Sequence, residues 1–328
     1  MIVENQKLNL KLFQDDVEKI PIRQGYGDGL LQAGIDDERV VALCADLTES
    51  TRTILFAEKF PERFVELGVA EQNLAAVASG MAAGGKIPFM TSYAVFSPGR
   101  NLEQIRTTIC YNNRNVKIAG SHAGVSVGPD GGSHQALEDI ATMRVLPRMR
   151  VLVPADSVEA KKATEAAAKN DGPVYVRLAR EKTPVVTTVD SPFEFGKANL
   201  LWEHDNPSVA IIACGPLVYN SLIAAKNLEA KGVHVLVLNL HTIKPIDVDA
   251  VIAVAEMAGS VVTAEEHQVA GGMGSAVAEV LAANYPVPME FVGVHDQFGQ
   301  SGKPEELIEH YGMGVKSIMA AVKKMKTK

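Results

Sequence analysis

The sequence predicts an α/β protein of two doubly wound domains, each with a mostly parallel sheet. Short apolar runs alternate with longer amphipathic segments, and this alternation is typical of strands joined by helices that cover both faces of a sheet. The alternation stops near residue 183 and restarts after residue 200. A length of 328 residues also fits two domains better than one.

The first half contains apolar runs of strand length separated by stretches with helical spacing. The predicted strands are Val40–Cys44, Ile87–Met90, Val116–Ala119, Val151–Val153 and Val174–Leu178. The predicted helices include Glu71–Ala83, Leu102–Tyr111 and Val158–Lys169.

The segment Thr183–Leu200 carries two prolines and little periodicity, so we expect a linker there. The boundary near residue 190 gives two domains, residues 1–190 and residues 191–328. The predicted strands of the second domain are Val209–Ala213, Val233–Leu238, Val261–Thr263 and Phe291–Val294, and its predicted helices include Leu217–Ala230 and Val248–Ala258.

The composition excludes several classes of partner and location. A net charge of -7 and the lack of a long basic run outside the last few residues argue against nucleic acid and anionic membranes as partners. The 3 cysteines share no metal-ligand spacing, and an odd number argues against a disulfide framework. The N-terminus lacks the pattern of a signal peptide, and no apolar run reaches transmembrane length. We therefore expect a cytoplasmic protein.

Two candidate sites lie within the first 50 residues. The triplet Gly27-Asp28-Gly29 could begin a magnesium and diphosphate site, but no Asn ligand follows at a usable distance and the surrounding pattern is helical. We therefore interpret it as part of a helix. The segment Asp46–Ser50 follows a predicted strand, where open α/β sheets bind ligands; by itself, a helix N-cap explains it better.

Glu71 follows a predicted strand end and a turn at Gly68, and it begins a helix of small apolar residues. A helix N-terminus can stabilise its carboxylate, while apolar neighbours shield it from water. A first-turn Glu that only complements the helix dipole is the commoner arrangement.

The most informative segment runs from Ser121 to Gln135. It follows a predicted strand and holds His122, Asp130 and His134 among many glycines, which imply a close approach of the backbone to another group. These side chains favour hydrogen bonding and proton transfer to a polar substrate over metal binding. We therefore predict no metal site in this chain.

Two weaker candidates involve anion binding. Arg23, Arg100, Arg106 and Arg180 are suited to phosphate, although the sequence alone does not distinguish them from surface arginines. An acidic segment, Glu265–His267, precedes a glycine-rich helix entry that could bind an anion. Helix packing explains that glycine-rich turn equally well.

Together, these segments resemble the transketolase family. The turn Asp-Leu-Thr at 46–48, Gly-Val-Ala-Glu-Gln at 68–72 and Gly-x-Asp-Gly-x-x-His-Gln at 128–135 follow one another in the family's order. The resemblance extends from about residue 20 to residue 315 and covers the family's pyrimidine-binding and C-terminal domains. It lacks the domain that binds magnesium and diphosphate, so it implies one subunit of a split enzyme.

The resemblance implies that thiamine diphosphate is shared with an N-terminal transketolase subunit, which also holds most of the Mg²⁺ ligands. Two copies of each subunit are expected. The implied reaction moves a two-carbon ketol unit from a ketose to an aldose, with sugar phosphates as substrates.

The resemblance also implies residue roles. Glu71 would hydrogen-bond the aminopyrimidine ring and favour its imino tautomer, and Phe96 would stack on that ring beside Tyr93. Asp46 would lie near the cofactor at the subunit interface. The residues expected to bind donor and acceptor hydroxyls are His122, Asp130 and His134, and those expected to hold the sugar phosphate are Arg23, Ser50 and Arg180.

The sequence departs from the family at two places. A third pocket aromatic is missing from the segment 97–101, and Glu181 stands beside Arg180, where a carboxylate weakens attraction for phosphate. Three alternatives remain open. They are a deoxyxylulose phosphate synthase, the β subunit of a 2-oxoacid dehydrogenase, and a non-catalytic scaffold derived from transketolase.

Overall fold

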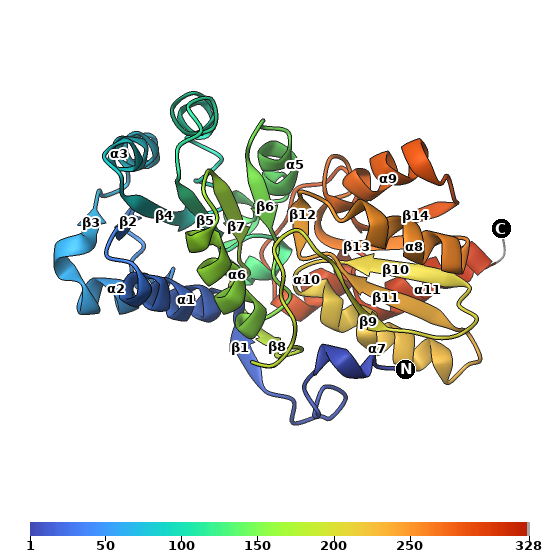
Figure 1. Cartoon of the computed structure of the whole chain (residues 1–328). Coiled ribbons are helices and arrows are strands. Elements are labelled where there is room, and N and C mark those ends of the chain that lie inside the picture. Colours follow the sequence, from blue (N-terminus) through green and yellow to red (C-terminus); the bar gives the residue numbers. More distant parts are fainter. Residues whose placement is uncertain (327–328) are drawn as a thin grey trace.

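The computed structural model describes residues 1–326. Two open sheets lie side by side, and helices cover both faces of each (Figure 1). This arrangement confirms the predicted fold class. Within residues 1–326, no helix combines the length and apolarity needed to cross a membrane.

The first sheet has the strand order β12-β6-β7-β5-β4-β2-β3, and every neighbouring pair is parallel except β12 with β6. Buried strands of this kind read as continuous apolar runs, which explains why the sequence revealed most of them. The strands are β2 (Val40–Cys44), β3 (Phe64–Glu66), β4 (Ile87–Tyr93), β5 (Lys117–Ser121), β6 (Arg150–Leu152), β7 (Val174–Arg177) and β12 (Thr242–Lys244).

Helices α1 (Ile22–Asp36), α2 (Ile54–Lys59) and α6 (Ser157–Lys169) share one apolar cluster on one face of this sheet (Figure 1). On the other face lie α3 (Glu71–Ala83), α4 (Leu102–Gln104) continued by the π-helical turn η3 (Ile105–Cys110), and α5 (Asp139–Arg144). The short 3-10 turn η2 (Pro61–Arg63) precedes β3.

The glycines of α1 allow it to pack closely against α6. A Cβ on Gly25 would lie 1.7 Å from the carbonyl oxygen of Ser157, and one on Gly29 would lie 2.7 Å from that of Lys161. The triplet Gly27-Asp28-Gly29 is therefore part of a helix, as predicted, and its first and last residues face neighbouring segments.

The second sheet has the order β14-β13-β10-β11-β9, and only β9 runs antiparallel to its neighbour. Its strands are β9 (Asn199–Trp202), β10 (Val209–Ala213), β11 (Val235–Asn239), β13 (Val261–Gln268) and β14 (Met289–Val294). Helices α8 (Val248–Ala258) and α9 (Met273–Asn284) cover one face, and α7 (Leu217–Glu229) and α11 (Val315–Lys326) cover the other. Helix α10 (Pro304–His310) contacts the first domain.

The predicted linker was wrong at both ends. Residues Lys182–Pro184 form β8, which pairs antiparallel with β1 (Lys19–Pro21), and β9 begins at Asn199. Strands of three or four residues at an edge are too short to show a period of two, so the sequence pattern did not reveal them.

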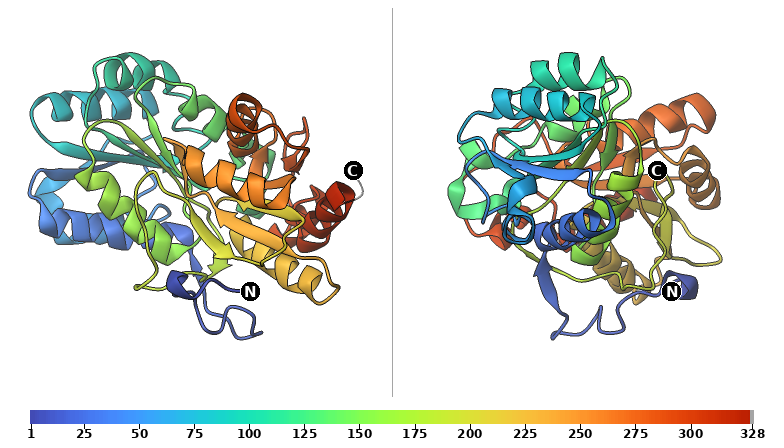
Figure 2. Two further views of the ribbon diagram at one scale, coloured as in Figure 1. Left: turned by 45° about the vertical axis from the view of Figure 1, so that its right-hand side comes forward. Right: turned by 60° about the vertical axis from the view of Figure 1, so that its left-hand side comes forward.

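The segment before β1 lies against the second domain. After the 3-10 turn η1 (Glu4–Gln6), Leu8 and Leu12 join its apolar cluster, and Ile2 forms a bridge with Trp202. Figure 2 shows this segment reaching across to the second sheet. In return, β12 from the second half joins the first sheet. Each half of the chain thus contributes a segment that packs in the other half. The division at residue 190 stays a prediction.

A buried ion pair of the first domain lies against the second domain. Arg177 on β7 donates to Asp139 at 2.8 Å, and its side chain also donates to the carbonyl oxygens of Ala136 and Glu266, on opposite sides of the domain boundary. Burial alone would raise the pKa of Asp139, but the charge of Arg177 holds it below its usual range. The buried carboxylate therefore depends on Arg177 for its counter-charge.

We expect Arg177→Met to lower the free energy of unfolding by about 3–5 kcal/mol, because it leaves a buried carboxylate unpaired. Urea denaturation followed by circular dichroism measures the change. Arg39→Met is a matched control, since it removes an ion pair that is exposed on the surface. Equal shifts of the two midpoints would contradict the proposed importance of the buried pair.

Candidate functional site

The predicted site residues gather at one edge of the first sheet. Parallel pairing places Cys44, the end of β2, beside both Thr91 and Glu66, and places Tyr93 beside Ser121. The chain leaves β2, β3, β4 and β5 at this edge, which is where open α/β sheets bind ligands.

Glu71 is the first residue of α3 and is buried, with only 4% of its surface exposed. Gly68, at φ +65°, makes the turn that leads from β3 into this helix. Asn101 donates to the backbone carbonyl oxygen of Glu71 at 2.9 Å and ties the helix start to the segment after β4. The prediction of a shielded carboxylate at a helix start is confirmed.

Four rings form a cluster beside Glu71's helix. Tyr93 stacks on His122 with ring centroids 3.8 Å apart and lies 5.9 Å from Phe96. His134 meets the edge of both aromatic rings, at 6.4 Å from Tyr93 and 5.4 Å from Phe96. The structure therefore brings together two histidines and two aromatic residues that come from separate segments.

His122 is buried and held in a left-handed backbone conformation, with φ +58°. Its Nδ1 is 2.9 Å from the hydroxyl of Ser121. Burial, followed by the charges of Arg23, Arg180 and His134, lowers the pKa of His122 to about 2. The ring is therefore neutral at physiological pH, where it can accept or donate a hydrogen bond but cannot serve as an imidazolium acid.

Arg23 and Arg180 converge near His122. The Nε of Arg23 donates to the carbonyl oxygen of Arg180 at 3.1 Å, and its Nη1 donates to that of Ser50. Arg180 donates to the carbonyl oxygen of Val127 at 2.7 Å. Burial and the nearby Arg52 and Arg180 lower the pKa of Arg23, which shows how closely these cations crowd together.

Glu181 makes an ion pair with Arg180 at 2.9 Å. The carboxylate that departs from the family pattern thus contacts the arginine directly. It offsets part of the positive charge that a phosphate would meet.

Glu66, the last residue of β3, binds the loop that follows β2. The Glu66 carboxylate accepts from the backbone N–H of Asp46 at 2.7 Å, from the hydroxyl of Thr48 at 2.8 Å and from the backbone N–H of Gly68 at 2.9 Å. The N-cap interpretation of this loop was wrong: α2 begins at Ile54 without a side-chain cap. Asp46 is exposed at the start of this loop.

The glycine-rich segment contains the 3-10 turns η4 (Val125–Asp130) and η5 (Gly132–His134). Its glycines approach the second domain: a Cβ on Gly132 would lie 2.5 Å from the carbonyl oxygen of Gly299, and one on Gly131 would lie 2.5 Å from the hydroxyl of Ser301. The predicted close approach is confirmed, and the neighbour is the loop before α10. Asp130 is exposed at the end of η4.

Of the two interpretations left open for the segment after β13, the structure contradicts the anion site. Glu265, Glu266 and His267 are buried within the strand rather than in a loop. The carboxylate of Glu265 accepts from the backbone N–H groups of Met273 and Gly274 at 2.7 and 2.8 Å. The protein's own carboxylate therefore occupies the start of α9 that an anion would need.

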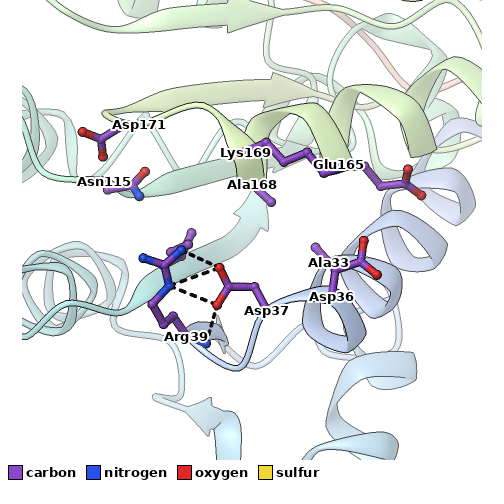
Figure 3. Close-up of a pocket in the computed structure, with 10 residues that line it drawn as sticks. Ala33, Asp36, Asp37, Arg39, Asn115, Glu165, Ala168, Lys169 and Asp171 are labelled. Atoms are coloured by element: carbon purple, nitrogen blue, oxygen red, sulfur yellow. Dashed lines mark hydrogen bonds and ion pairs between the residues drawn. The ribbon is translucent and has the colours of Figure 1, made fainter.

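A separate cavity of about 360 Å³ opens at the opposite edge of the first sheet. Figure 3 shows Asp37 and Arg39 paired in it, with Asn115 and Asp171 nearby. It lies at the amino ends of β4 and β5, away from the ring cluster. Asp37 and Arg39, two of its charged lining residues, bind each other.

Sequence reasoning missed the contacts of two residues. Glu66 carries no motif that distinguishes it from a surface carboxylate, although its place at the end of β3 was a signal. Arg100 was considered for phosphate, but it contacts Glu71: its Nη1 is 3.2 and 3.3 Å from the two carboxylate oxygens. It lies in the segment that lacks the third aromatic.

Residues 18–185 match the model of the transketolase pyrimidine-binding domain, and residues 196–318 match that of the transketolase C-terminal domain. The chain belongs to the transketolase family. Family membership implies dependence on thiamine diphosphate. Within residues 1–326, no cluster of three or more His, Cys, Asp or Glu side chains is arranged to hold a metal.

Individual transketolase relatives match nearly end to end. The chain is 41% identical to the 6-deoxy-6-sulfo-D-fructose transketolase subunit SqwH of Clostridium sp. (strain MSTE9), over 94% of this chain and 95% of that protein. It is 37% identical to an apulose-4-phosphate transketolase subunit of Phocaeicola vulgatus, over 91% of this chain and 95% of that protein.

A solved structure described as a split gene transketolase, inactive β4 tetramer, superposes with a TM-score of 0.87. It has 47% sequence identity and covers 94% of this chain and 99% of that one. This transketolase chain therefore resembles subunits of split enzymes along almost its whole length.

We expect the His122 ring to stay neutral down to the pH at which the protein unfolds, because its pKa lies near 2. Histidine-detected NMR between pH 5 and pH 9 measures this, with a His122→Asn variant to assign the resonance. A titration of the assigned signal with a midpoint above pH 5 would contradict the burial argument.

Proposed function

We propose that this chain is the pyrimidine-binding subunit of a split transketolase that transfers a two-carbon ketol unit between sugars. The observation that carries the proposal is that one planar group, the guanidinium of Arg100, contacts both the buried carboxylate of Glu71 and the face of Phe96. A planar group with N–H donors fits between them, since the guanidinium of Arg100 already contacts both. An aminopyrimidine offers the same kind of surface.

Thiamine diphosphate supplies the carbanion-stabilising chemistry of the reaction. Glu71 would hydrogen-bond the pyrimidine ring and hold its tautomer, and Phe96 would stack on the ring. Tyr93 lies nearly parallel to Phe96, with the ring centroids 5.9 Å apart. Asp46 lies near the cofactor at the subunit interface. A separate N-terminal subunit carries the diphosphate and most of the Mg²⁺ ligands, and the assembly has two copies of each subunit.

The substrates we propose are sugars with an anionic group. His122, Asp130 and His134 bind the donor and acceptor hydroxyls, with His134 available for proton transfer. Arg23, Ser50 and Arg180 hold the phosphate. Two relatives support an anionic substrate, because their names specify a sulfo sugar and a sugar phosphate.

The relatives named as subunits also support the need for a partner. The β4 tetramer described as inactive supports an isolated chain that assembles with itself but does not turn over. All three cysteines are free and buried, which supports a location in the reducing cytoplasm.

Reconstitution tests the proposal. The purified chain with thiamine diphosphate and Mg²⁺ should be inactive, and addition of a subunit with the diphosphate-binding domain should restore ketol transfer from a panel of ketose and aldose phosphates. Glu71→Gln in that assembly should lose roughly 100- to 10,000-fold in turnover, with an unchanged circular dichroism spectrum. Ketol transfer by the chain alone would contradict the split-enzyme proposal.

Arg180→Ala should raise KM for phosphorylated sugars more than for unphosphorylated ones, because it removes a charge-assisted contact to the phosphate. Steady-state kinetics on matched sugar pairs measures the difference. Glu181→Gln is the opposing control: it releases Arg180 from its ion pair and should lower KM for the phosphorylated member. Equal effects on both members of a pair would assign Arg180 a structural role.

A further inference from the structure

Arg100 lies over the two groups that we propose to hold the pyrimidine ring. Its guanidinium carbon is 4.2 Å from the centroid of the Phe96 ring, an arrangement typical of a cation–π contact. Its Nη1 contacts both carboxylate oxygens of Glu71, at 3.2 and 3.3 Å. One side chain therefore covers the aromatic face and neutralises the carboxylate at the same time.

The contact answers an electrostatic need of the chain without cofactor. A buried carboxylate is costly unless it is paired and hydrogen-bonded. Within residues 1–326, the only side-chain donor to the Glu71 carboxylate is Arg100. The start of α3 adds a favourable dipole, but it does not supply a full counter-charge.

Arg100 is also placed so that it can leave. Its side chain is 51% exposed, whereas that of Glu71 is 4% exposed. The backbone around it is fixed, because a Cβ on Gly99 would lie 2.0 Å from the carbonyl oxygen of Val95 and Asn101 is buried against Glu71. Departure therefore needs only a change of side-chain rotamer.

We propose that Arg100 is a displaceable placeholder for the aminopyrimidine ring: it holds Glu71 and Phe96 in the cofactor-free chain and is expelled when the cofactor binds. This inference rests on the proposed function. The guanidinium and the pyrimidine ring cannot contact the same ring face and the same carboxylate together. The apparent affinity for cofactor is therefore reduced by the fraction of chains in which Arg100 is closed.

The test measures thiamine diphosphate binding by calorimetry in the reconstituted two-subunit assembly with Mg²⁺. If about nine chains in ten are closed, Arg100→Ala should lower Kd by about tenfold. Arg106→Ala, which removes an exposed arginine of the same segment, should leave Kd within about twofold. In a Glu71→Gln background the effect of Arg100→Ala should fall to within about twofold, because the anchor of Arg100 is lost.

A second readout needs no cofactor. In the isolated chain, Arg100→Ala should lower the thermal midpoint, because Glu71 loses its counter-charge, and Glu71→Gln added to that variant should restore most of the loss. Arg106→Ala should leave the midpoint unchanged. Arg100→Lys, which keeps the charge but not the planar stack, should fall between wild type and Arg100→Ala in both measurements.

An unchanged or weaker Kd for Arg100→Ala, with normal binding by wild type, would overturn the placeholder inference and leave the proposed function intact. An unchanged thermal midpoint for Arg100→Ala would also overturn it. Failure of every variant and of wild type to bind thiamine diphosphate in the assembly would overturn the proposed function and the inference with it.

Discussion

The parallel register of β2, β4 and β5 fixes the carboxyl ends of these strands on one edge of the first sheet. The loops that leave this edge have little freedom, because their first residues continue buried strands. Tyr93 and Ser121 are paired across β4 and β5, so the ring of His122 comes directly over Tyr93. A slip of one residue in either strand would turn these side chains to the opposite face.

The sequence predicted the elements that have a strong local pattern. It did not reveal those whose form depends on contacts with distant parts of the chain. The bounds of β2, α3 and α8 agree with the predictions, because β2 is an unbroken apolar run and the two helices show helical spacing. The short edge strands β8 and β9 owe their form to partners elsewhere in the chain. For Glu71 the sequence left two interpretations open, a shielded carboxylate and a first-turn Glu that only complements the helix dipole, and the structure shows the shielded one.

The partners of the site residues could not be predicted in the same way. Arg100 and Glu71 are 29 residues apart, and their contact depends on a loop geometry that no periodicity encodes. The glycine-rich segment shows the same limit. Its composition indicated a close approach, but the loop that it approaches begins about 165 residues later, as the bond from Gln135 to Gln300 illustrates. The candidate site residues of the first domain are thus positioned in part by the second domain.

The ion pair between Arg180 and Glu181 bears on how fast an anionic sugar, the substrate proposed above, would reach the ring cluster. Long-range attraction depends on the net charge at the mouth, and an adjacent carboxylate cancels much of the field of Arg180 beyond a Debye length of about 8 Å at physiological salt. Arg180 then acts mainly on ligands already in contact, and long-range attraction at this edge is left to its neighbours Arg23 and Arg52. Under the proposed function, the grip of Arg180 on a bound sugar would depend less on ionic strength than the sugar's approach does.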